Sequence, residues 1–177
     1  MKRVLGALAA AAALGIAAGC ATVGPPVDAA QVKYPTAEIA SLERALADAP
    51  EGDDLPKLLL SRGHAYLLEG ENWLKAHPDG GERQRGYAGY AGHFLKAITD
   101  FETIVVAHAD SPEAPEAMFH LGVVHDSPNL NNLFLAIEYY RRTMEEHPGT
   151  EWAKSASQSL ASIREQFHHM FRESHGL

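Results

Sequence analysis

This sequence has one cysteine and few basic residues. Cys20 is the only cysteine among 177 residues, so neither an internal disulfide bond nor a cysteine-based zinc site can form. Only 15 Lys and Arg stand against 23 Asp and Glu, which gives a formal charge of −8. An acidic surface repels a phosphate backbone, so the composition disfavours nucleic acid as a partner.

Motifs of the common enzyme classes are also missing. The chain contains neither a Gly-x-Ser-x-Gly nucleophile motif nor a Gly-x-x-x-x-Gly-Lys-Ser/Thr phosphate loop. Its ten histidines include no His-Glu-x-x-His, and His120 and His125 are spaced too far apart to share one helical face. His108 and His147 are expected at the negative ends of two helices, a structural role. The sequence therefore predicts no enzyme, no cofactor and no metal site.

The N-terminal residues have the features of a secretory signal peptide. Met1, Lys2 and Arg3 precede an apolar run from Val4 to Ile16, which is too short to cross a bilayer because a spanning helix needs about 20 residues. A basic start, a short apolar run and small residues after it are typical of a secretory signal.

The segment Ala17-Ala18-Gly19-Cys20 resembles a bacterial lipobox, although the family more often has Leu at the position of Ala17. The resemblance implies cleavage after a signal peptide at 1–19 and acylation of Cys20. Ala21 stands where an Asp would resemble an inner-membrane retention signal, so we expect a lipid-anchored protein on the periplasmic side of the outer membrane. An ordinary signal peptide with a chance cysteine is the alternative. Residues 20–35, with three prolines, are predicted to form the lipidated cysteine and a flexible tether.

Beyond the tether every strong signal is helical. Apolar residues recur at steps of three and four, which predicts an all-α domain over 36–172 and a short tail at 173–177. Thr36, Ser111 and Thr150 are expected to cap helices, and either Asn131 or Asn132 a further one. Predicted helices cover 36–49, 112–126 and 132–147, and another covers 55–69 and ends at Gly70. A loop at 70–86 is followed by a long helix that ends near His108. The last helix has an apolar stripe that includes Phe167 and Phe171.

Two segments of the chain align without a gap. Placing 97–121 over 136–160, an offset of 39 residues, matches Ala97 with Ala136, Phe101 with Tyr140 and Leu121 with Leu160. Small residues let two helices approach each other, and an aromatic fills the space to the next unit. The alternative is two unrelated amphipathic helix pairs.

The aligned residues resemble the tetratricopeptide repeat, a helix pair of about 34 residues. The positions that carry the resemblance are Leu121-Gly122, Ala136, Tyr140 and Pro148 in one unit and Gly63, Tyr66, Gly70, Ala97 and Phe101 in an earlier unit. Arg62 departs from the Leu of the family, and Thr143 from its Ala. The resemblance implies a short superhelical array of antiparallel helix pairs, a solenoid, whose last helix from Leu160 acts as a cap.

Such an array has a concave surface lined by the first helices of its units. By resemblance, the groove positions are Leu60, His64, Leu67, Glu116, Phe119, Val123, Gln158, Ser162 and Glu165. Phe119 is the candidate anchor for a partner, with core packing as its alternative role. We expect a scaffold or adaptor that binds another cell-envelope protein. The alternative is a small-ligand-binding lipoprotein that works with a solute transporter, with Trp73, Tyr87 and Tyr90 lining a pocket.

Overall fold

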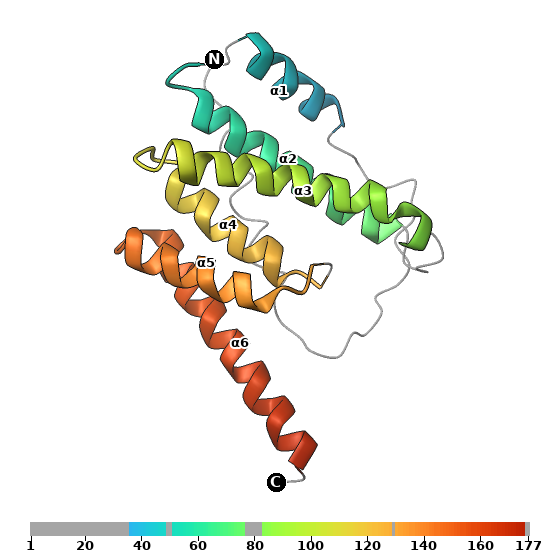
Figure 1. Cartoon of the computed structure of the whole chain (residues 1–177), viewed down its shortest axis with the longest axis vertical. Coiled ribbons are helices and arrows are strands. Elements are labelled where there is room, and N and C mark those ends of the chain that lie inside the picture. The colour runs from blue at the N-terminus through green and yellow to red at the C-terminus, as the bar shows by residue number, and fades with distance from the viewer. Residues whose placement is uncertain (1–35, 49–50, 77–82, 129, 176–177) are drawn as a thin grey trace.

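The computed structural model describes residues 36–48, 51–76, 83–128 and 130–175, with the backbone alone described at 76, 83–91 and 168–175. The residues it describes form helices and no strand, so the predicted all-α class is confirmed. The six helices among them, coloured along the chain in Figure 1, are α1 (Thr36–Asp48), α2 (Leu55–Ala76), α3 (Arg83–Ala107), α4 (Ala114–Asp126), α5 (Leu133–Glu146) and α6 (Glu151–His175).

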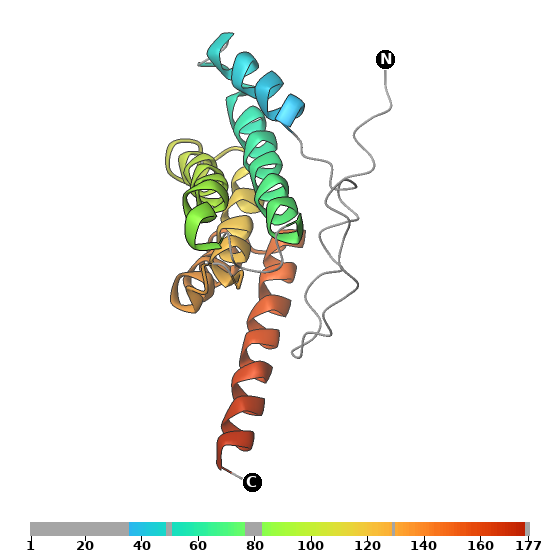
Figure 2. The same ribbon diagram turned by 90° about the vertical axis from the view of Figure 1, so that its right-hand side faces the viewer.

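Helix α4 is the centre of the packing. Each helix packs against the next one in the chain in a roughly antiparallel way, and α4 also contacts α2 and α6. In Figure 2, α3 and α5 lie on one side of α4, and α2 and α6 lie on the other. Helix α4 therefore contacts both α2 and α6, although α3 separates α2 from α4 in the sequence and α5 separates α4 from α6.

The predicted apolar stripes supply the core. A large cluster contains buried residues of α1, α2, α3 and α4. A smaller cluster joins α5 to α6 and is made of Ala136, Tyr140, Ala156 and Ile163. Burying a large aliphatic or aromatic side chain stabilises a fold by roughly 1.5–3 kcal/mol. The fully buried side chains of the large cluster come from α3 and α4 and include Ala97, Phe101, Ile104, Ala117 and Leu121.

Two of the predicted helix caps form. Asn132 Oδ1 accepts a hydrogen bond from the backbone N–H of Leu135 at 3.3 Å, so Asn132 caps α5, and its neighbour Asn131 adopts a positive φ of 44°. Thr150 Oγ1 accepts from the backbone N–H of Ala153 at 3.1 Å at the start of α6. Each cap satisfies one of the N–H groups that a helix start leaves free.

The predicted cap at Ser111 is wrong. The N-cap residue of α4 is Glu113, whose side chain makes no capping hydrogen bond, and Ser111 Oγ is buried without a hydrogen-bond partner among the described residues. A tight turn comes first, in which the backbone N–H of Ala114 donates to the carbonyl of Ser111 at 3.1 Å. Because of this turn, α4 begins after Pro112, at Ala114.

Gly70 does not end α2, in contrast to the sequence-based prediction. The helix continues to Ala76, and a Cβ built on Gly70 would lie 3.2 Å from Cζ of Phe94 on α3. The glycine therefore allows α2 and α3 to approach closely, and the helix passes through it. Because α3 already begins at Arg83, the predicted loop at 70–86 is shortened at both ends, and its middle, 77–82, lies outside the described residues.

Two further glycines lie against aromatic rings. A Cβ built on Gly63 of α2 would lie 2.5 Å from Cε1 of Phe101 on α3, and one built on Gly122 of α4 would lie 2.5 Å from Cε1 of Tyr140 on α5. Real Cβ atoms do not approach a ring so closely, so only glycine fits at either position without a shift of the neighbouring helix. Phe101 and Tyr140 are two of the residues matched by the 39-residue offset.

Helix α6 is buried only in its first part. Ala153, Ala156 and Ile163 of its apolar stripe are buried. Phe167, further along the stripe, is 47 % exposed, and the side chain of Phe171 lies outside the described part of the chain. In Figure 2 the C-terminal half of α6 extends past the other helices, so no described helix covers this end of the stripe. The helix continues to His175, into the segment predicted as a tail.

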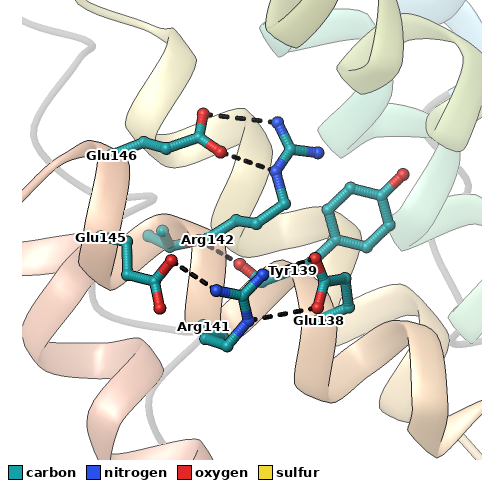
Figure 3. Close-up of polar contacts among 7 residues, drawn as sticks. Glu138, Tyr139, Arg141, Arg142, Glu145 and Glu146 are labelled. Carbon is teal, nitrogen blue, oxygen red and sulfur yellow. Dashed lines mark hydrogen bonds and ion pairs between the residues drawn. The ribbon is translucent and has the colours of Figure 1, made fainter.

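The outward face of α5 carries charged side chains (Figure 3). Arg141 pairs with Glu138 and Glu145, and Arg142 pairs with Glu146. Glu145 and Glu146 are both exposed, and such exposed ion pairs contribute little to stability. None of the described helices combines the length and the apolar character needed to cross a membrane.

Candidate functional site

The apolar groove positions belong to the packed interior. Leu60 is 9 % exposed, and Leu67 packs against the same large cluster. Phe119 and Val123 are partly buried against the smaller cluster of α5 and α6. Phe119 also lies beside the rings of Tyr140 and Trp152, with centroids 5.7 and 5.5 Å away. These four side chains therefore contribute to the core, and any contact that Phe119 makes with a partner uses only part of its ring.

The groove positions on α6 differ from these. Gln158 and Glu165 are exposed, and Ser162 is half-buried. A partner that lies along α6 would meet polar side chains there.

The remaining two groove positions, His64 and Glu116, meet between α2 and α4. His64 Nε2 lies 3.6 Å from Glu116 Oε1. His120, one turn after Glu116 on α4, brings its Nε2 to 3.9 Å from the same oxygen. Both distances exceed a normal hydrogen bond of about 2.7–3.2 Å. One ligand atom from each of the three side chains lies within 4.8 Å of the others, and no other described group of three or more His, Cys, Asp and Glu is gathered in this way.

Burial governs the charge of these three side chains. It lowers the pKa of His64 to about 4, and together with the nearby His64 it lowers the pKa of His120 to about 3. Burial, followed by the carboxylates of Glu151 and Glu113, raises the pKa of Glu116 to about 7. Both imidazoles are therefore neutral near pH 7, and each keeps a free lone pair on one ring nitrogen.

Aromatic rings enclose His120. Its ring lies 4.4 Å from that of His64, 5.7 Å from Phe101 and 5.7 Å from Trp152, measured between centroids. Within the described part of the chain, His64 Nε2 and His120 Nδ1 are buried and make no hydrogen bond. A buried polar atom without a partner costs free energy, so a ligand that bonded to either nitrogen would stabilise the fold.

The sequence did not predict this cluster, because spacing within one helix carries no information about a ligand from another helix. His64 comes from α2 and is separated from Glu116 and His120 by the whole of α3. The i, i+4 spacing of Glu116 and His120 was a usable signal, since it places both side chains on one helical face.

A second polar contact lies at Arg62, a position where the sequence differs from the tetratricopeptide pattern that it was expected to resemble. Arg62 donates two hydrogen bonds to the carboxylate of Asp100, at 2.9 and 2.7 Å. Asp100 is 2 % exposed, so Arg62 supplies the partner that a buried carboxylate requires. Nearby, Tyr66 Oη donates to Glu43 Oε1 at 2.7 Å, which ties α2 to α1.

Several predicted features lie outside the described residues. They are the signal peptide at 1–19, Cys20 with the tether to residue 35, and the side chains of Tyr87 and Tyr90. Trp73, the third member of the predicted pocket, is partly buried against the large core cluster.

No family model, no curated protein and no solved structure matches this chain at a significant level. The described residues define an all-helical domain of six packed helices. Its function has to be inferred from the residues themselves.

Proposed function

We propose that this chain is a lipid-anchored scaffold that faces the periplasm and binds another cell-envelope protein. In this proposal the domain is a short tetratricopeptide-like array, and its concave surface is formed by α2, α4 and α6. Acyl chains on Cys20 hold it to the outer membrane. In this proposal Lys2 and Arg3 leave with the signal, which makes the net charge more negative and disfavours electrostatic attraction to anionic lipids.

The observation that carries the proposal is the pair of equivalent glycine–aromatic contacts. Gly63 meets Phe101 between α2 and α3, and Gly122 meets Tyr140 between α4 and α5. Two helix pairs with the same close contact support a stacked array, and arrays of this kind present extended binding surfaces. The contacts of α4 with both α2 and α6 support the placement of the first helices side by side.

Site-specific photo-crosslinking in the native envelope tests the binding surface. A photoreactive residue at Gln158 or Glu165, both exposed on α6, is expected to capture one dominant envelope protein, which mass spectrometry identifies. Phe134 on α5, which is 81 % exposed and not a groove position, is the control. Capture from Phe134 but from neither α6 position would contradict the use of the concave surface.

The anchor and the alternative function are tested separately. Cys20→Ser is expected to abolish lipid attachment and to leave the protein soluble or uncleaved, and unchanged membrane retention would exclude the lipoprotein assignment. If no position captures a protein, and native mass spectrometry of the purified chain finds a bound organic molecule, the small-ligand carrier becomes the better proposal.

A further inference from the structure

The cluster of His64, Glu116 and His120 has the dimensions of a metal site. Ligand atoms that share one tetrahedral Zn²⁺ at about 2.0–2.2 Å lie roughly 3.3–3.6 Å from one another. Glu116 Oε1 lies 3.6 Å from His64 Nε2 and 3.9 Å from His120 Nε2, and all three ligand atoms fit within 4.8 Å. The two distances to Glu116 Oε1 therefore exceed this range by no more than about 0.3 Å.

The chemistry of the three donors fits the same ion. Two imidazole nitrogens and one carboxylate oxygen are a donor set that Zn²⁺ accepts with a fourth position left for water, whereas Ca²⁺ and Mg²⁺ prefer oxygen ligands. Each neutral imidazole has one ring nitrogen whose lone pair can bind a metal ion. His64 Nε2, the nitrogen nearest Glu116, makes no hydrogen bond within the described residues and is free to act as a ligand.

The surroundings favour a cation. Glu113 and Glu151 both act on Glu116 with negative charge. No Lys or Arg forms an ion pair with Glu116, whose ion-pair contacts in the described part of the chain are with His64 and His120. A divalent ion would relieve the repulsion among the carboxylates and satisfy the buried nitrogen at the same time.

We propose that His64, Glu116 and His120 bind one Zn²⁺ ion between α2 and α4. The ion joins two helices that are separated in the sequence by all of α3, so its binding stabilises the packing of the first helix pair on the second. Zinc binding here is independent of the proposed scaffold role, and either can hold without the other.

Metal titration of the purified, metal-free chain tests the site. Isothermal titration with Zn²⁺ is expected to give one ion per chain and a higher Tm for the loaded protein. Loss of an outer-shell partner of a metal ligand already weakens metal binding by about 10–100-fold. His64→Gln and Glu116→Gln, which remove ligands, are therefore expected to raise the Kd for Zn²⁺ at least tenfold.

A matched histidine controls for adventitious binding. His93 Nδ1 lies 3.6 Å from Glu69 Oε2, the same separation as in the His64–Glu116 pair, but that pair belongs to no described group of three candidate ligands. His93→Gln is expected to leave the Kd for Zn²⁺ unchanged. The proposal is overturned if His93→Gln weakens binding as much as His64→Gln does, or if the unmodified chain takes up no stoichiometric Zn²⁺.

Cobalt substitution adds a readout that does not depend on stability. Co²⁺ in the site is expected to show the intense visible absorption of a four-coordinate ion, and this absorption should be lost in Glu116→Gln. Circular dichroism of each metal-free variant confirms that it is folded before titration. A folded Glu116→Gln variant with an unchanged Co²⁺ spectrum would exclude Glu116 as a ligand.

Discussion

Gly122 lies so close to the ring of Tyr140 that a Cβ on the glycine would be 2.5 Å from Cε1 of the tyrosine. Tyr140 is fully buried, so its ring cannot swing into solvent without disrupting the core. Gly63 and Phe101 repeat this relationship. A Cβ on Gly63 would also be 2.5 Å from Cε1 of Phe101, and Phe101 is also fully buried. The distance between the two helices of each pair is thus set by the absence of one methyl group.

Gly122→Ala is expected to destabilise the fold by about 1–3 kcal/mol, the usual cost of overpacking a core. The sign of this change in stability is informative, because alanine is intrinsically more favourable than glycine inside a helix by about 1 kcal/mol and would by itself stabilise the fold. Urea denaturation of the variant measures the change in the free energy of unfolding.

Gly92→Ala is the matched control, because Gly92 also lies within a helix but a Cβ added to it would meet no atom within 4 Å. We expect it to be neutral or to stabilise by up to about 1 kcal/mol. Equal effects of the two substitutions would mean that the contact with Tyr140 does not constrain the helix pair.

Arg62→Leu is expected to cost about 3 kcal/mol, because it leaves the buried carboxylate of Asp100 without its bidentate partner. Leucine is the residue that the tetratricopeptide pattern has at this position, so the repeat consensus alone predicts no loss. Urea denaturation distinguishes the two expectations.

The double variant Arg62→Leu/Asp100→Leu removes the unpaired charge together with its partner. It is expected to be more stable than Arg62→Leu alone, since replacing both members of a buried pair by apolar groups is often nearly neutral. If the double variant loses the sum of the two single losses, the pair is not coupled.

Leu121→Ala and Phe119→Ala separate core packing from a binding role. Leu121 is fully buried, so its truncation is expected to cost about 2–5 kcal/mol. Phe119 is only partly buried, so Phe119→Ala should cost less and should weaken capture of the partner. Thermal denaturation that finds the two substitutions equally damaging would assign Phe119 to the core alone.

Acidification is expected to weaken the fold through His125. This side chain is 9 % exposed and stacks on Tyr139 at 5.7 Å, and burial lowers its pKa below the usual 6.5 in spite of the carboxylate of Glu102. As the pH falls below about 6.5, the unfolded chain gains a proton that the folded chain does not take up. The free energy of unfolding therefore decreases from about pH 6.5 downward until the lowered pKa is reached.

His125→Phe isolates this contribution, because His64, His120 and Glu116 titrate in both proteins. Between pH 7.5 and pH 5 the unmodified chain should lose more stability than the variant, measured by urea denaturation at each pH. Parallel losses would show that His125 is not held in its neutral form.

The helical signals in the sequence were sufficient for the class and for most helix boundaries, because amphipathic spacing and caps are local. Asn132 and Thr150 cap their helices through hydrogen bonds to residues three positions ahead, which the sequence can indicate. The predictions that Gly70 ends a helix and that Ser111 caps one are wrong. For Gly70 the reason is not local. Whether a glycine ends a helix or accommodates a ring depends on Phe94, which approaches from another helix and carries no local signal.

The candidate site was predictable only in part. His64 and Glu116 were placed together on one surface by the repeat alignment, and the structure brings them to 3.6 Å. Their meeting with His120, and the partnership of Arg62 with Asp100, depend on the angles between helices. Those angles follow from packing of side chains across the core and cannot be read from spacing along one chain.

The succession of helix contacts also bears on how the chain folds. The extensive contacts described link helices that are neighbours or next neighbours in the sequence, with α4 at their centre. Few distant segments have to meet, and low contact order is associated with folding within microseconds to milliseconds. Helices α1 to α4 share one core cluster, so they can pack together once α4 is available, and the chain can acquire its structure progressively from its N-terminal helices onward.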